Sequence, residues 1–176
     1  MLEIEVKISI KDPESIRKKL ERAGAVLHRD RHFEENVLFD LPGEVLFHKR
    51  TALRLRTSGK KSYLTFKGPK QKSRRFKVRE EFETELRDPK QAAKILRSLG
   101  YREVFRYSKH RTVFRTKKIT VCLDETAVGS FMELEGDRSD IVRFARKLGF
   151  PKQDFIQTDY ITMLKESARD VTEKNG

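Results

Sequence analysis

Alternating hydrophobic and polar positions dominate the first ten residues of the chain. In the segment LEIEVKISI, residues 2–10, apolar side chains occupy the even positions, and Glu3, Glu5, Lys7 and Ser9 occupy the odd ones. Side chains of an extended strand point alternately to its two faces, so this pattern predicts a β-strand with one apolar and one ionic face. Two carboxylates and an ammonium group spaced about 7 Å apart offer a metal site beside a phosphate site.

The same alternation recurs along the rest of the chain. Further strands are expected over residues 26–40, 52–57, 62–67, 75–86, 101–115, 119–124 and 131–136, which brings the total to about eight. Leu53 and Leu55 lie opposite Arg54 and Arg56, and short turns separate most of these strands. The pattern predicts a mostly antiparallel sheet.

Helical periodicity appears in four places, at residues 13–23, 88–99, 139–148 and 158–168. Asp12-Pro13 and Asp88-Pro89 open the first two, since aspartate is a good N-cap and proline suits the first helical position. The similarity of these two openings predicts an internally duplicated fold, in which Glu5 corresponds to Glu81. We interpret the last helix as a packing element. Tyr160 and Lys165 in it are candidates to cover one end of the structure.

Composition indicates one soluble α+β domain over residues 1–168, with helices outside the sheet and a polar tail over 169–176. The net charge of +13 indicates an anionic partner. The single cysteine, Cys122, makes a disulfide framework impossible and indicates a cytoplasmic setting. The sequence has no apolar run long enough for a membrane span, so we expect no membrane partner.

Blocks of like charge distinguish these polar faces from those of an ordinary sheet. A sheet with one face in water also alternates, and its charged residues need no further role. Here, however, like charges share one strand face in four pairs: Glu3 and Glu5, Arg54 and Arg56, Lys109 and Arg111, and Glu133 and Glu135. Such pairs repel and are costly to bury without counter-ions. A divalent cation bound to a polyphosphate supplies both kinds of counter-ion.

The charged positions follow an order that resembles the CYTH superfamily, the triphosphate tunnel metalloenzymes. E-I-E-V-K at residues 3–7 is similar to the N-terminal ExExK signature of that family. The other motifs follow over residues 2–165: A-L-R-L-R at 52–56, T-F-K-G-P at 65–69, R-x-E-x-E at 79–83, K-x-R at 109–111, V-C-L-D at 121–124 and E-L-E at 133–135. The resemblance implies a closed eight-stranded antiparallel β-barrel, a triphosphate tunnel with its ionic faces inward.

Within that family the chain resembles the class IV adenylate cyclase branch through residues 32–40, 67–69 and 158–164. The resemblance implies that Mg²⁺ or Mn²⁺ supports conversion of ATP to cyclic AMP and pyrophosphate. It implies catalytic roles for Glu3, Glu5, Lys7 and Asp124. Triphosphate binding is implied for Lys7, Arg54, Arg56, Lys67, Arg79, Lys109 and Arg111. Metal binding is implied for Glu3, Glu5, Glu81, Asp124, Glu133 and Glu135.

Two alternatives remain open at this point. Thiamine and inorganic triphosphatases share the same tunnel motifs, so the motifs do not choose between attack by a ribose hydroxyl and attack by water. A basic RNA-binding module is the alternative of another class, with the basic run at 67–77 as its candidate strip. That alternative lacks aromatic side chains interleaved with the basic ones, so no specific nucleic-acid partner is expected. A homodimer is compatible with the sequence.

Overall fold

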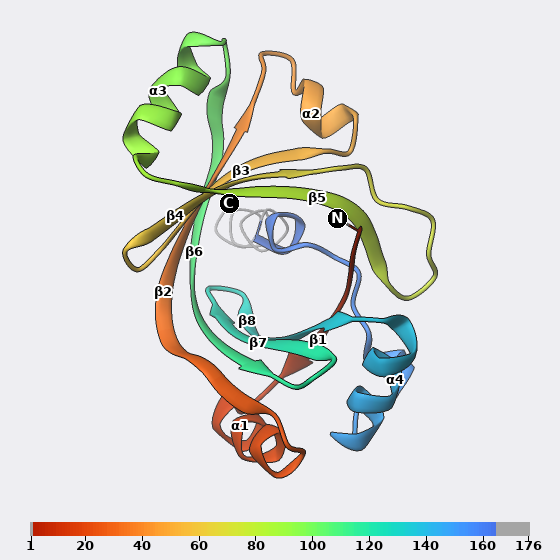
Figure 1. The fold of residues 1–176 in the computed structure, drawn as a ribbon. Helices are drawn as coiled ribbons and strands as arrows, with labels where there is room; N and C mark the ends of the chain where they lie inside the picture. The colour runs from red at the N-terminus through yellow and green to blue at the C-terminus, as the bar shows by residue number, and fades with distance from the viewer. Residues whose placement is uncertain (1, 165–176) are drawn as a thin grey trace, which may run out of the picture.

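The centre of the protein is a closed barrel of eight antiparallel strands. The computed structural model describes residues 2–164, and neighbouring strands in it follow the order β1-β5-β4-β3-β2-β6-β7-β8 (Figure 1). The strands are Leu2–Ile10 (β1), Val26–Asp40 (β2), Ala52–Ser58 (β3), Lys61–Lys67 (β4), Lys77–Leu86 (β5), Arg102–Arg115 (β6), Ile119–Thr126 (β7) and Gly129–Gly136 (β8). The predicted barrel is confirmed.

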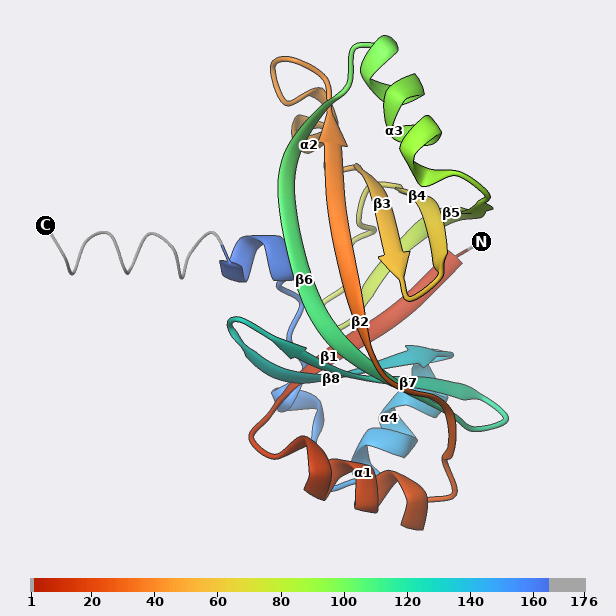
Figure 2. The same cartoon turned by 90° about the vertical axis from the view of Figure 1, so that its left-hand side faces the viewer.

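Helices pack on the outside of this barrel. The longer ones are α1 (Pro13–Arg22), α3 (Pro89–Ser98) and α4 (Arg138–Lys147). Figure 2 shows α1 and α4 together on one side of the barrel and α3 on the opposite side. Asp12 and Asp88 cap α1 and α3 by accepting backbone hydrogen bonds, and a proline follows each. No helix among residues 2–164 is long and apolar enough to cross a membrane.

The hydrophobic core lies between the outer face of the barrel and the helices. Apolar residues of β1, β6, β7 and β8 form one cluster with α1 and α4, and a smaller cluster joins β2 and β3 to α3. Val6 and Lys7 are neighbours in β1, and both are buried. Val6 belongs to the outer core, whereas Lys7 faces inward. Apolar burial therefore stabilises the protein from outside and leaves the interior to charged groups.

The two strand-helix-strand units β1-α1-β2 and β5-α3-β6 begin their helices with the same local geometry. The N-cap Asp12 has φ −132° and ψ 97°, and Asp88 has φ −133° and ψ 96°. Internal duplication of the chain stays a prediction, as does the domain boundary at residue 168.

The structure departs from the predicted elements at a few places. Strand β5 begins at Lys77 instead of residue 75. A short helix, α2 (Val45–His48), and a 3₁₀ turn, η1 (Lys152–Asp154), were not predicted, because a helix of one turn shows no periodicity. The predicted helix over 158–168 is helical from 160 to 164. Residues 165–168 of the predicted helix, with Lys165, and the tail at 169–176 lie outside the described residues.

Candidate active site in the barrel interior

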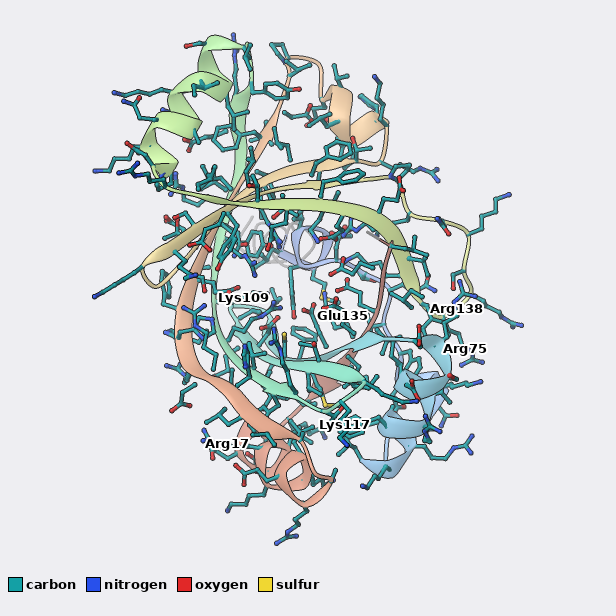
Figure 3. All side chains as sticks on the ribbon, viewed as in Figure 1. Arg17, Arg75, Lys109, Lys117, Glu135 and Arg138 are labelled. Atoms are coloured by element: carbon teal, nitrogen blue, oxygen red, sulfur yellow. The ribbon has the colours of Figure 1, made fainter. Side chains whose placement is uncertain are left out.

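The barrel encloses a cavity of about 1180 Å³. Its walls are the ionic strand faces that the alternation predicts, since Lys109 and Glu135 point into it while Arg75, Lys117 and Arg138 lie on the outside (Figure 3). Among residues 2–164, the cations and carboxylates that the strands place in or directly behind the lining balance one another, while Arg50, Lys70 and Asp159 line the cavity from outside the strands. The strand residues are Lys7, Arg54, Arg56, Lys67, Lys77, Arg79, Lys109 and Arg111, against Glu3, Glu5, Glu34, Glu81, Glu83, Asp124, Glu133 and Glu135.

One group of cations lies on the wall formed by β3, β4 and β5. Arg56 donates hydrogen bonds to Glu83 at 3.0 and 3.2 Å, and Lys67 donates to Glu81. The Nε atoms of Arg54 and Arg56 are buried and have no hydrogen-bond partner among the described residues. A buried guanidinium donor without a partner is costly, so this wall is suited to bind an anion with several oxygens.

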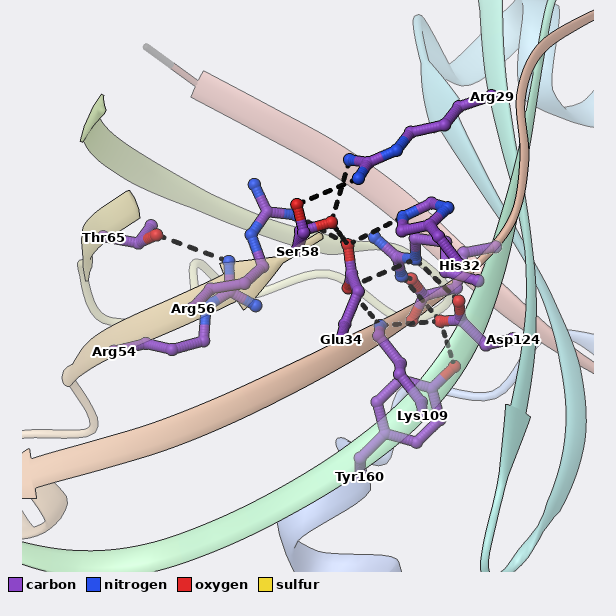
Figure 4. A network of polar contacts seen from close by, with 12 residues as sticks. Arg29, His32, Glu34, Arg54, Arg56, Ser58, Thr65, Lys109, Asp124 and Tyr160 are labelled. Carbon is purple, nitrogen blue, oxygen red and sulfur yellow. Dashed lines mark hydrogen bonds and ion pairs between the residues drawn. The ribbon is translucent and has the colours of Figure 1, made fainter. Parts of the chain in front are cut away.

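Lys109 and Arg111 form a second group, which is held from behind by Asp124 (Figure 4). Lys109 Nζ donates to Asp124 Oδ2 at 2.8 Å, and Arg111 Nε and a terminal nitrogen donate to its two oxygens at 2.6 Å each. Tyr160 Oη donates to Oδ2 at 2.9 Å. Burial opposes the charge of Arg111, but Asp124 and Glu133 act against it, and the pKa of Arg111 is raised. Asp124 is thus placed to orient two cations, and donors already surround its carboxylate.

Glu34 of β2 is a buried interior carboxylate that the sequence reasoning missed. It is 2% exposed, accepts a hydrogen bond from Ser58 Oγ at 3.0 Å, and lies within 4.0 Å of Arg56, Lys109 and Arg111. Burial would raise the pKa of Glu34, but these three cations lower it to about 2. The signal was present in the sequence, since His32, Glu34 and Asn36 alternate with apolar Phe33 and Val37.

Lys7 connects the interior to the segment that follows α4. Lys7 Nζ lies 3.7 Å from Glu133, donates to the carbonyl oxygen of Thr158 at 3.1 Å, and lies 3.4 Å from the centroid of the Tyr160 ring. Burial lowers the pKa of Lys7 to about 8 even though Glu133 opposes the shift. Tyr160 is only 6% exposed. The segment around Tyr160 therefore contributes to the cavity wall. From the sequence alone, this segment is interpreted as a packing helix.

Glu3, Glu5 and Glu135 form the part of the interior that is best suited to a cation. Glu5 and Glu135 are paired across β1 and β8. Burial, followed by the charges of Glu3 and Glu5, raises the pKa of Glu135 to about 7. Glu3 Oε2 is buried without a hydrogen-bond partner among the described residues. Crowded carboxylates repel one another, and a hard divalent cation would relieve this repulsion. These residues fit Mg²⁺ or Mn²⁺.

The predicted metal ligands are not all gathered at one position. Within the described part of the chain, no three His, Cys, Asp or Glu side chains are arranged around a common metal position. Lys77 contacts Glu5, and Arg111 donates to Glu133 at 2.6 Å. Asp124 accepts hydrogen bonds from Lys109, Arg111 and Tyr160. The roles assigned to the individual site residues stay predictions.

This arrangement defines a class of protein, a closed antiparallel barrel whose interior is lined by charged side chains. The family model of the CYTH domain matches residues 1–160, and the chain belongs to the CYTH family.

Three relatives illustrate this membership. A Methanocaldococcus jannaschii protein named "Putative adenylate cyclase" is 27% identical over 174 residues, which cover 93% of this chain and 98% of that protein. A solved structure from Vibrio parahaemolyticus is also described as a "putative adenylate cyclase". It has a TM-score of 0.82 at 19% identity, and the match covers 94% of this chain and 98% of that one. A solved structure from Hippeastrum, described as a "putative adenylyl cyclase" with a dominant triphosphatase activity, has a TM-score of 0.70 at 20% identity and covers 94% of this chain and 96% of that one. At these identities the two solved structures show the shared fold alone.

Proposed function

We propose that this protein is a metal-dependent enzyme that acts on a triphosphate inside the barrel, and that its reaction converts ATP to cyclic AMP and pyrophosphate. One observation carries the proposal. Cations from five strands, with buried guanidinium donors that lack hydrogen-bond partners among the described residues, surround a cavity in which Glu3 and Glu5 add to burial in raising the pKa of Glu135. A polyphosphate bound through a divalent cation would satisfy both groups at once.

The protein's own residues account for most of the chemistry of such a site. Arg54, Arg56, Lys67 and Arg79 would bind the phosphate oxygens from one wall, and Lys109 and Arg111 from another. Asp124 would keep those last two cations oriented when no substrate is present. Phosphoryl and nucleotidyl transfer depend mainly on such positioning and on charge neutralisation at the non-bridging oxygens. A divalent cation held by Glu3, Glu5 and Glu135 would supply further charge neutralisation and lower the pKa of the attacking hydroxyl group.

Cyclisation requires the ribose 3′-oxygen to lie in line with the α-phosphorus, so that pyrophosphate leaves. The relative in Methanocaldococcus jannaschii favours this reaction by its name. Hydrolysis at the γ-phosphorus is the second candidate, because it needs only the phosphate chain and a water molecule. The Hippeastrum protein favours it, since the same fold carries a dominant triphosphatase activity there.

Product analysis distinguishes these reactions. The purified protein is incubated with ATP, thiamine triphosphate or tripolyphosphate in Mg²⁺ or Mn²⁺, and the products are separated by chromatography. Cyclic AMP and pyrophosphate from ATP are the expected products. Orthophosphate from ATP or tripolyphosphate, with no cyclic nucleotide, would mean that the protein is a triphosphatase and not a cyclase. No turnover of any of the three substrates with either metal would contradict the proposed function.

A further inference from the structure

One stretch of the cavity wall, beside α2, is formed by apolar and aromatic side chains. Leu38 of β2, Tyr107 of β6 and Phe47 and His48 of α2 all line the cavity there. Leu38 is paired with Arg54 across β2 and β3, so this apolar and aromatic border adjoins the cationic wall directly. If the phosphates of a ligand contact Arg54, the group attached to those phosphates would therefore lie against these rings.

Helix α2 is held in place by a buried carboxylate. Asp40, at the end of β2, is 4% exposed and accepts backbone hydrogen bonds from Leu41 at 2.7 Å, Leu46 at 2.8 Å and Phe47 at 3.0 Å. Both acceptor oxygens are used, and the bond from Phe47 fixes the backbone that carries its ring.

The segment around α2 is also strained. Glu44 and Arg50, on either side of the helix, have φ of 54° and 56°, which side chains other than glycine rarely adopt. Such a conformation persists only where the surrounding structure enforces it, and it is common at ligand-binding sites. Asp40 fixes the helix between these two residues, and Arg50 and Thr51 donate backbone hydrogen bonds to Phe47 and Leu46 at 2.9 Å each.

We infer that α2 forms a binding site for the base of a nucleoside triphosphate, with Phe47 as the ring on which the base stacks and Asp40 as the residue that positions α2. This inference rests on the proposed function and places the base of its substrate. Arg50 lines the same cavity, where Lys70 is paired with Asp159 at 3.1 Å. A neutral base suits the charge of Arg50 better than the cationic thiazolium ring of thiamine triphosphate does, because like charges repel.

Equilibrium binding tests the inference without turnover. Calorimetry in EDTA compares the affinities of ATP, thiamine triphosphate and tripolyphosphate for the wild-type protein and for Phe47→Ala, Phe47→Tyr and Asp40→Asn. Stacking of a base on an aromatic ring contributes about 1–3 kcal/mol, so Phe47→Ala should weaken ATP binding at least about fivefold. Tripolyphosphate binding should change less than about twofold. Phe47→Tyr should keep the affinity for ATP. Asp40→Asn should lower the affinity for ATP more than the affinity for tripolyphosphate.

Phe33→Ala is the matched control, because Phe33 is a 52% exposed ring on the outer face of β2. It should leave the affinities for all three ligands unchanged. Equal losses for ATP and tripolyphosphate in Phe47→Ala, or no loss for either, would overturn the inference. So would wild-type protein that binds thiamine triphosphate more tightly than ATP. Wild-type protein that binds none of the three ligands in EDTA and turns over none of them in Mg²⁺ or Mn²⁺ would instead overturn the proposed function itself.

Discussion

Glu34 should be one of the most stabilising charged residues of the protein, although it lies behind the cavity. The replacement Glu34→Gln keeps the shape of the side chain and removes its charge. Arg56, Lys109 and Arg111 would then face one another without the carboxylate that lies within 4.0 Å of all three.

The magnitude follows from the pKa of Glu34, which falls from 4.5 to about 2 in the folded protein. Each unit of pKa is worth about 1.4 kcal/mol, so ionised Glu34 contributes about 3 kcal/mol to the free energy of unfolding at neutral pH. Because the folded-state pKa is the lower one, this contribution is complete above about pH 4.5 and is lost as the pH falls toward 2. By about pH 3 less than half of it should remain.

Urea unfolding at pH 7 and pH 3 measures this effect in the wild-type protein, Glu34→Gln and Glu35→Gln. Glu35 is the matched control, because its ion pair with Arg106 lies on the outer surface. Exposed ion pairs contribute little, so Glu35→Gln should cost less than about 1 kcal/mol. Equal stability of Glu34→Gln and wild type at pH 7, or a difference that does not shrink toward pH 3, would refute this electrostatic reasoning.

Three further predictions concern the cavity. Tyr160→Phe loses the hydrogen bond to Asp124 but keeps the ring over Lys7, so calorimetric unfolding should show a loss of about 1 kcal/mol; unchanged stability would mean that this bond adds nothing. Glu135→Gln should lower metal-dependent turnover at least about tenfold at saturating ATP while the melting temperature at neutral pH rises, because the raised pKa of Glu135 means that its charge opposes folding. The exposed Glu80→Gln should turn over ATP normally, and full activity in both variants would remove Glu135 from the metal site. RNA binding should weaken steeply with salt while tripolyphosphate binding weakens much less, because the net charge of +13 lies largely outside a balanced interior; equal salt slopes would favour the RNA-binding alternative.

The sequence predicted the faces of the strands well because strand geometry leaves little choice. In β1, alternation alone places Lys7 inward and Val6 in the outer core, and the structure has both there. The same holds for Arg54 and Arg56 in β3 and for Glu133 in β8. Closure of the barrel came from the resemblance, because periodicity does not report which strand pairs with which.

The sequence did not predict which opposite charges meet across the barrel. Glu34 meets Lys109 only because β2 and β6 pair in one register, and that pairing contains several irregularities. Tyr160 was a candidate to cover one end of the structure, but its contact with Asp124 was missed for a similar reason, since it reaches Asp124 from a segment that follows α4 and runs back to the barrel. Helix α2 depends on three backbone bonds to Asp40, which leave no periodic signal in four residues.

A crystal structure of the protein with a non-cleavable ATP analogue and Mn²⁺ tests the central claim most directly, since the anomalous signal of manganese locates the metal. We expect the triphosphate inside the barrel, within hydrogen-bond distance of Arg54, Lys67 and Arg111, and manganese beside Glu5 and Glu135. A triphosphate bound only on the outer surface, with the interior ion pairs of Lys77 with Glu5 and of Lys109 with Asp124 intact, would contradict the claim that this barrel is a triphosphate site.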